Sequence, residues 1–416
     1  TDNIANFSFP KKVGSEIKVV GVGGGGGNAV NHMFKQGIRD VDFIICNTDA
    51  QALNASPVGT KVQLGPSLTE GRGAGNKPEK GKEAALENID EVKKALSENT
   101  KMVFITAGMG GGTGTGGAPV IAQACKELGF LTVGIVTIPF RNEGRRRIKQ
   151  AIEGIEELEN HVDSLLVINN ERIREMYGDF GISEAFARAD NVLATAAKGI
   201  AEIITVPGYI NVDFADVETV MRKSGLAVMG TGVASGEGRA EDAVEKALNS
   251  PLLNNNDIRG AKNILLNITS GTKEVTMDEI GRITDFVQNK AGFDADLIWG
   301  NGKDETLGED ISVTIIATGF STSSIPKITG NKSVEKEVHV FADNAFVPEP
   351  PQVIKPMEKK PPVVTNQKTI EFEITNEKVE EKNDDPEFES LYPKTVQERQ
   401  KNEIKNVSTD LSTMSD

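Results

Sequence analysis

Two glycine-rich runs hold the residues whose types and spacing could bind phosphate. The first, Gly21–Asn28, follows the apolar run Ile17–Val22, and the second, Ala107–Gly117, follows Met102–Thr106. Glycine lacks a Cβ, so several backbone N–H groups can crowd around phosphate oxygens, and a helix that follows adds its positive end. Both runs therefore predict phosphate binding where a strand ends.

The first run alone leaves the kind of nucleotide open. It contains G-x-G-x-x-G, which is typical of dinucleotide-binding folds, and Asn47 and Asp49 lie near where a ribose-binding acid is expected. A mononucleotide site fits the same residues equally well. A loop that is rich in glycine for structural reasons is the third interpretation.

The second run favours a mononucleotide. It interleaves seven glycines with Thr113 and Thr115, and we expect it to open a helix over Ala118–Leu128 with Pro119 in the first turn. A dinucleotide-binding fold does not ordinarily place a second phosphate cradle on a later strand. The pattern G-x-x-x-x-G-K-[ST] is missing, which argues against a P-loop nucleotide hydrolase.

The elements that must position these runs alternate along the chain. Short β-rich runs are expected at Ile17–Val22, Val41–Cys46, Met102–Thr106, Leu131–Ile138 and Ser164–Ile168. Helical patterns are expected at Pro78–Leu96, Ala118–Leu128 and Arg145–His161. Such alternation predicts an α/β domain with a parallel sheet between layers of helices, which binds ligands where strands end and helices begin.

Composition divides the chain further. We expect a flexible leader over residues 1–16, a nucleotide-binding domain ending in a central helix over 17–206, and a loop with a connecting helix over 207–225. A smaller α+β domain is expected over 226–320. Beyond it, residues 321–416 are rich in Pro, Lys, Glu, Asn and Thr without apolar periodicity, which predicts a disordered linker and tail.

Charge and cysteine content argue against several classes of function. The chain has 46 Lys and Arg against 61 Asp and Glu, a net charge of −15, and such a surface repels the nucleic-acid backbone. Cys46 and Cys125 lie in apolar runs, which favours packing over a disulfide or a zinc site. No membrane-span or signal-peptide pattern occurs, so we expect the cytoplasm.

Four motifs resemble the tubulin and FtsZ family of GTPases. They are GGGTGTG at Gly110–Gly116, GVGGGGGNAVN at Gly21–Asn31, NTDAQAL at Asn47–Leu53 and NVDFADV at Asn211–Val217. The resemblance runs from Ile17 to Gly319 and is nearer to the bacterial FtsZ branch than to eukaryotic tubulin. It implies a tubulin-like fold and a cytoskeletal GTPase that polymerises with GTP, forms the division ring and releases GDP and phosphate.

The resemblance assigns phosphate contacts to both glycine runs. In the first run they are Gly24, Gly25, Gly26, Gly27 and Asn28. In the second run they are Gly110, Gly111, Gly112, Thr113, Gly114, Thr115 and Gly116. Gly73, Ala74 and Gly75 resemble a loop that closes over the γ-phosphate, although the residues that follow depart slightly from the family pattern.

Further nucleotide contacts follow from the same resemblance. Asn47 and Asp49 match a loop near the γ-phosphate and Mg²⁺, and a carboxylate suits this cation because Mg²⁺ prefers oxygen ligands. Asp49 could instead only cap a turn after the strand. Glu143 and Arg147 resemble ribose and phosphate contacts, with a solvated helix start as the alternative for the arginine.

Base recognition is assigned to Phe186 and Asp190. A phenyl ring can stack on a purine, and a carboxylate can accept from the N1–H and the N2 amine of guanine together, a donor pair that adenine lacks. Their i, i+4 spacing places both on one helix face. Asn191 is a second candidate for this contact, because some relatives have Asn before Asp here. A core Phe and a surface Asp are the alternative.

Hydrolysis is assigned to Asn211, Asp213 and Asp216. Two carboxylates at i, i+3 can orient a water toward phosphorus, while Asp213 can also cap the next helix. The three histidines, His32, His161 and His339, are expected to be structural or solvated.

In this architecture the carboxylate loop should lie opposite the glycine runs, and would serve the nucleotide of a neighbour stacked head to tail. The resemblance implies the same shared site. We therefore expect a homopolymer that exchanges GTP and GDP at the mid-cell division site. Membrane-tethering division proteins would bind the tail, although Phe388–Pro393 matches the family's docking peptide poorly.

Two other functions stay open from the sequence. A dinucleotide-binding oxidoreductase needs only one glycine loop and a hydride-transfer site, so the second run argues against it. A tubulin-like filament protein that does not hydrolyse nucleotide would not need both Asp213 and Asp216. Phosphate release would separate this second alternative from a GTPase.

Overall fold

The computed structural model describes residues 14–38, 40–97, 99–177, 181–205, 209–210, 212–250, 258–292 and 294–320. Most of the expected leader, the expected tail, Asn211 and His339 lie outside the described residues. Among the helices described, none combines the length and the apolar character that crossing a bilayer requires.

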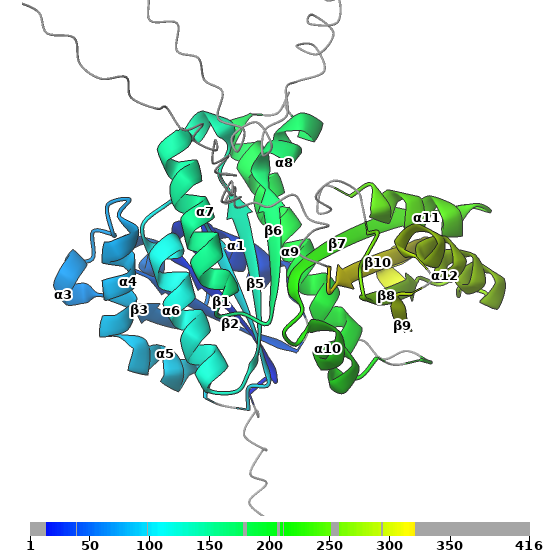
Figure 1. The fold of residues 1–416 in the computed structure, drawn as a ribbon, viewed down its shortest axis with the longest axis horizontal. Coiled ribbons are helices and arrows are strands. Elements are labelled where there is room, and N and C mark those ends of the chain that lie inside the picture. The colour runs from blue at the N-terminus through cyan, green and yellow to red at the C-terminus, as the bar shows by residue number, and fades with distance from the viewer. Residues whose placement is uncertain are drawn as a thin grey trace, which may run out of the picture. The chain divides into compact units, whose positions relative to one another are not determined.

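A mixed sheet runs through the described part of the chain, in the order β3-β2-β1-β4-β5-β6-β7-β10-β8-β9 (Figure 1). The bounds are β1 Ile17–Val22, β2 Val41–Asn47, β3 Thr60–Gln63, β4 Met102–Gly108, β5 Leu131–Ile138, β6 Ser164–Asn169, β7 Gly225–Ala234, β8 Asn263–Ser270, β9 Asp296–Lys303 and β10 Ile311–Thr318. Strands β1 to β7 run parallel, whereas β10 runs antiparallel to β7 and β8. The predicted α/β class with a parallel sheet is confirmed.

Helices cover both faces of the parallel part. The bounds are α1 Gly23–Gln36, α2 Ala50–Ala55, α3 Pro66–Thr69, α4 Pro78–Glu87, α5 Ile89–Leu96, α6 Thr113–Glu127, α7 Arg145–Glu159, α8 Asn170–Tyr177, α9 Ile182–Thr205, α10 Phe214–Met221, α11 Arg239–Leu248 and α12 Met277–Ala291. Alternation along β1 separates the layers, because Ile17 and Val19 join the core under α1 and α9 while Lys18 bonds to Ala95 of α5. Figure 1 shows α6 and α7 on the same face as α4 and α5.

Two helical expectations were wrong in detail. Helix α6 begins at Thr113, five residues before the predicted start, so Pro119 lies inside the helix and cannot donate a bond to the carbonyl of Thr115. The single helix expected over Pro78–Leu96 is two helices, which divide at Asn88. The side chain of Asn88 accepts a hydrogen bond from the N–H of Gly65, 2.9 Å away.

The two halves of the chain share the sheet. Strand β7 pairs with β6 over three residue pairs, from Ser164↔Gly225 to Leu166↔Ala227. One apolar cluster lies under α1 and α9, and a second is formed by β7, β8, β10, α11 and α12. The free thiols Cys46 and Cys125 are buried, and burial raises the pKa of Cys46 to about 12, which fits packing.

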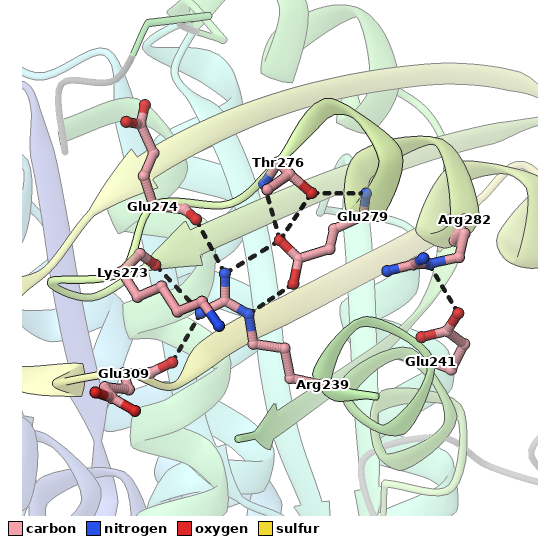
Figure 2. A network of polar contacts seen from close by, with 8 residues as sticks. All are labelled: Arg239, Glu241, Lys273, Glu274, Thr276, Glu279, Arg282 and Glu309. Atoms are coloured by element: carbon pink, nitrogen blue, oxygen red, sulfur yellow. Dashed lines mark hydrogen bonds and ion pairs between the residues drawn. The ribbon is translucent and has the colours of Figure 1, made fainter. Parts of the chain in front are cut away.

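The second cluster holds a buried ion pair (Figure 2). The guanidinium of Arg239, which is 0% exposed, donates to both carboxylate oxygens of Glu279 at 2.7 and 3.1 Å. Its remaining N–H groups donate to the backbone carbonyls of Lys273, Glu274 and Glu309 at 3.2, 3.0 and 2.7 Å. One side chain thus joins α11, α12 and two loops.

Candidate functional site

The two glycine runs lie side by side at the carboxyl ends of β1 and β4. These strands pair in parallel, with Val22 opposite Ala107. The runs pass directly into α1 and α6, so Gly24–Asn28 occupy the first two turns of a helix rather than a loop. No side chain caps either helix at Val22 or Gly112. The first N–H groups of both helices therefore point to one place where an anion can accept from them.

The glycines divide into two structural kinds. A Cβ on Gly26 would clash with the carbonyl of Thr106, and one on Gly116 would clash with the carbonyl of Pro78. These two positions need glycine for close packing of helix against strand and helix against helix. At Gly24 and Gly111 a Cβ would meet nothing within 4 Å, so these two positions border open space. The structural interpretation thus holds for part of each run, and the open positions mark the candidate cradle.

The threonines of the second run are held within the protein. The hydroxyls of Thr48 and Thr113 are 2.7 Å apart and buried, and the hydroxyl of Thr115 accepts from the N–H of Gly110 at 2.9 Å. Ala74 is buried, and a Cβ on Gly112 would lie 2.8 Å from the Cβ of Ala74. The segment 73–75 therefore lies against the second glycine run, as a closing loop requires.

Asp49 acts as the cap of α2. Its Oδ1 accepts from the N–H groups of Gln51 and Ala52 at 2.9 and 3.1 Å, and its own N–H donates to the side chain of Asn47 at 3.2 Å. The bond between Thr48 and Thr113 places this loop beside the start of α6. The oxygen donors of Asn47 and Asp49 suit Mg²⁺, which binds few protein ligands when phosphates supply the others. Among the described residues, no group of three or more His, Cys, Asp or Glu is arranged to hold a metal.

Glu143 and Arg147 form an ion pair of 2.8 Å beside the second run. The other carboxylate oxygen of Glu143 accepts from the N–H of Phe140 at 2.9 Å. A Cβ on Gly110 would lie 2.7 Å from the carbonyl of Arg147, so the first turn of α7 touches this run.

Phe186 and Asp190 share a face of α9 near the end of β5. The ring of Phe186 is 45% exposed and packs edge-on against Phe140, with centroids 5.2 Å apart. Burial raises the pKa of Asp190 to about 6, and the charge of His32 opposes this shift. A partly buried carboxylate beside an exposed ring can receive a flat ligand that carries N–H donors.

His32 was expected to have a structural or solvated role, and the structure places its charge near Asp190, where it opposes the rise of the Asp190 pKa. The ring nitrogen Nε2 of His32 and the amide of Gln36 lie 3.2 and 3.0 Å from the side-chain oxygen of Asn191. These contacts join α1, which starts in the first glycine run, to α9 at the residue next to Asp190. The i, i+4 spacing of His32 and Gln36 on α1 is the sequence signal that could have pointed to them.

The carboxylate loop lies at the other end of the strands. Asp213 caps α10 and forms a capping box with Asp216, in which each side chain accepts from the other's N–H, at 2.9 and 3.1 Å. The next residue, Phe214, has the ammonium of Lys101 5.8 Å from its ring centroid. Lys101 precedes β4 and the second glycine run follows it, so the length of that strand, about 20 Å, separates the carboxylates from the cradle. Asn211 lies outside the described residues.

Comparison with known proteins gives two family matches, one after the other along the chain. Residues 16–178 match the Tubulin/FtsZ family, GTPase domain, and residues 225–321 match the FtsZ family, C-terminal domain. Cell division protein FtsZ of Porphyromonas gingivalis is 50% identical over 323 residues, covering 77% of this chain and 70% of the relative. Its counterpart from Pseudomonas aeruginosa is 49% identical over 320 residues, covering 77% and 79%.

Solved structures agree with these matches. An empty FtsZ dimer from M. jannaschii superimposes with a TM-score of 0.69 at 44% identity, covering 73% of this chain and 88% of that one. A GTPγS-bound CetZ2 protofilament from Haloferax volcanii superimposes with a TM-score of 0.64 over 74% and 94% of the two chains, at 22% identity. The second likeness bears on the fold alone.

Proposed function

Because this chain belongs to the FtsZ family of tubulin-like GTPases, we propose that it assembles head to tail with GTP and hydrolyses GTP at subunit junctions. In this proposal each junction joins the glycine runs of one subunit to the carboxylate loop of the next. The family matches disfavour the dinucleotide oxidoreductase.

One observation carries the proposal of a shared site. The carboxylates of Asp213 and Asp216 are separated from their own phosphate cradle by the length of β4, about 20 Å. A side chain of this size cannot cross that distance. A second subunit stacked in the same orientation brings its carboxylate end to the cradle, and such a heterologous contact repeats into a filament.

The cradle would bind the phosphates of GTP. The end of α9 that carries Phe186 and Asp190 would bind the guanine base. The uncapped starts of α1 and α6 donate N–H groups to phosphate oxygens at the open positions Gly24 and Gly111. Asn47 and Asp49 would hold Mg²⁺, which offsets the negative charge of the phosphates. Asp190 would accept from guanine while Phe186 stacks on it.

The carboxylate loop would supply the positioning that phosphoryl transfer requires. Asp213 and Asp216 of one subunit accept hydrogen bonds from a water and direct its oxygen at the γ-phosphorus held by the neighbour. The water oxygen forms the new bond to phosphorus, the bond to the GDP oxygen breaks, and the proton of the water passes to a carboxylate or to solvent. Neither capping bond prevents this, because each carboxylate has a second oxygen.

The names of the relatives support a proposal for where the filaments form in the cell. FtsZ relatives are named as cell division proteins, so we propose that filaments of this chain form the ring at the cytoplasmic division site. Tethering to the membrane through division proteins that bind the tail is part of the same proposal.

Nucleotide-dependent assembly tests the proposal. Light scattering with Mg²⁺ should rise with GTP and stay at baseline with ATP or GDP, while phosphate release follows the GTP trace. Assembly with GTP but without phosphate release would instead support a filament protein that does not hydrolyse nucleotide. Absence of assembly under conditions where GTP is bound would contradict the filament proposal.

Asp190→Asn should reduce the preference for GTP over ATP by at least tenfold, because an amide cannot accept from both guanine donors. Without nucleotide the variant should be more stable at pH 8 by about 1 kcal/mol, after allowance for partial exposure. Burial raises the pKa of Asp190 to about 6, so protonation stabilises the folded parent as the pH falls below 6. The advantage of the variant should therefore shrink between pH 6 and 4. Competition binding and thermal unfolding measure both effects.

Glu184→Gln is the matched control, because Glu184 lies on the same helix and its pair with Arg188, at 3.6 Å, is exposed. It should leave nucleotide preference and the pH profile unchanged. If Asp190→Asn binds GTP as the parent does and discriminates equally well against ATP, Asp190 does not read the base.

A further inference from the structure

The carboxylate loop is fastened to an edge strand that lies far away in the sequence. Strand β9 pairs with β8 on one side, and in the described part of the chain the sheet ends at β9. The segment before Asp213 lies along the other side of β9. Edge strands present unpaired backbone groups, and this segment occupies some of them.

Asn301 of β9 makes the two bonds that hold the segment. Its side-chain oxygen accepts from the N–H of Ile210 at 2.8 Å, and its own N–H donates to the carbonyl of Ile210 at 3.1 Å. Both backbone groups of one loop residue are therefore satisfied by one residue, 91 positions along the chain. Such a two-bond contact fixes position and orientation together.

Gly300 brings the loop closer still. A Cβ at this position would lie 2.7 Å from Cγ2 of Val212 and 3.0 Å from the carbonyl of Ile210. Val212 is 4% exposed and belongs to the apolar cluster under α9, against which Ile298 of β9 also packs. The loop is thus pressed between the core and the backbone of β9, and Asp213 is the next residue.

We propose that Asn301 is a positioning residue for hydrolysis: by holding Ile210 it sets where Asp213 and Asp216 meet the nucleotide of the neighbouring subunit. The inference rests on the proposed function. Asn301 touches neither nucleotide nor water in this role. The part of the chain that contains β9 thereby aligns the carboxylates, while the part that contains β1 and β4 binds the nucleotide. A displacement of about 1 Å is enough to slow a positioned reaction severely.

Asn301→Ala removes the accepting oxygen and should lower kcat for GTP hydrolysis about tenfold, with GTP affinity within twofold of the parent. Asn301→Asp keeps an oxygen at the same place and should retain at least half of the parental kcat. Lys303→Ala is the control on the same strand, because the Lys303 side chain is 60% exposed and its ion pair with Glu305 lies at the surface. It should hydrolyse like the parent. Steady-state phosphate release, nucleotide binding and thermal unfolding give the three readouts.

The hydrolysis rate of mixed variants distinguishes a positioning role of Asn301 from a merely structural one, which would not change with the partner variant. Gly111→Arg fills the cradle but keeps the carboxylate side, whereas Asp213→Ala keeps the cradle and loses the carboxylate. Mixed with Gly111→Arg, Asn301→Ala should gain activity beyond the sum of the separate rates, because it can present its GTP to an intact loop. Mixed with Asp213→Ala, it should gain nothing.

The mixture of Gly111→Arg with Asp213→Ala is the reference that separates the positioning role of Asn301 from the site shared between subunits. If that mixture gains activity but the mixture of Gly111→Arg with Asn301→Ala does not, or if Asn301→Ala hydrolyses like the parent, the role of Asn301 is wrong and the shared site stands. If the reference mixture gains nothing although both variants are folded and co-assemble, the shared site itself is wrong. An Asn301→Asp variant as slow as Asn301→Ala would also overturn the role, because the accepting oxygen would then be irrelevant.

Discussion

Arg239→Leu should lower the free energy of unfolding by about 3–5 kcal/mol, because it leaves the carboxylate of Glu279 buried without its partner. The same substitution removes the donors to three backbone carbonyls, which join two loops to α11. Chemical denaturation of parent and variant measures the difference. The shorter leucine fills the space of the aliphatic stem only, so the loss reflects the unpaired polar groups together with the space that the guanidinium leaves.

Arg282→Leu is the matched control, since Arg282 and Glu241 form an exposed pair of 2.8 Å in the same region (Figure 2). Its cost should stay below about 1 kcal/mol. The hydrogen bond from Arg239 lowers the pKa of Glu279 to about 2, so the pair stabilises the fold above pH 4.5 and that contribution is lost as the pH falls toward 2. Equal costs for the two substitutions at pH 7 would show that the buried pair adds nothing special.

Asp213→Asn should reduce GTP hydrolysis by about a hundredfold or more while leaving GTP binding unchanged. Asparagine caps a helix as well as aspartate does, so α10 and the bond to the N–H of Asp216 are preserved. What disappears is the negative charge that orients and polarises the water. Phosphate release at saturating GTP, with nucleotide binding in parallel, measures this loss.

Asp304→Asn provides the control for the substitution itself. Asp304 also caps a short helical turn, accepting from the N–H of Thr306 at 3.0 Å. It should hydrolyse GTP at the parental rate. Were Asp213→Asn equally active, capping alone would explain Asp213 and the hydrolytic role would pass to other residues.

The sequence was a good guide to the sheet and a poor one to helix boundaries. Apolar runs identified the strands of the parallel part, except for the short β3, because the pattern of apolar residues is local. The start of α6 at Thr113 was missed because glycine has low helix propensity, and packing of Gly116 against Pro78 overrides it. The pairing of β7 with β6 could not be predicted, since the two strands lie far apart in the sequence.

For the candidate site, the sequence placed both glycine runs at strand ends, and the structure adds that these two strands are neighbours. It did not separate packing glycines such as Gly26 from open positions such as Gly24, because only the neighbours in space distinguish them. The contact of His32 with Asn191 could not be predicted, because it joins two helices that lie far apart in the sequence. The bond between Asn301 and Ile210 is equally non-local.

The central claim is that a single subunit does not hydrolyse GTP alone. The rate of phosphate release per subunit, measured as a function of protein concentration, tests this claim most directly. With saturating GTP and Mg²⁺, release per subunit should be negligible where sedimentation finds only monomers. It should rise once filaments form, in proportion to the number of junctions. A rate per subunit that stays constant down to concentrations with no assembled protein would contradict a site completed between subunits.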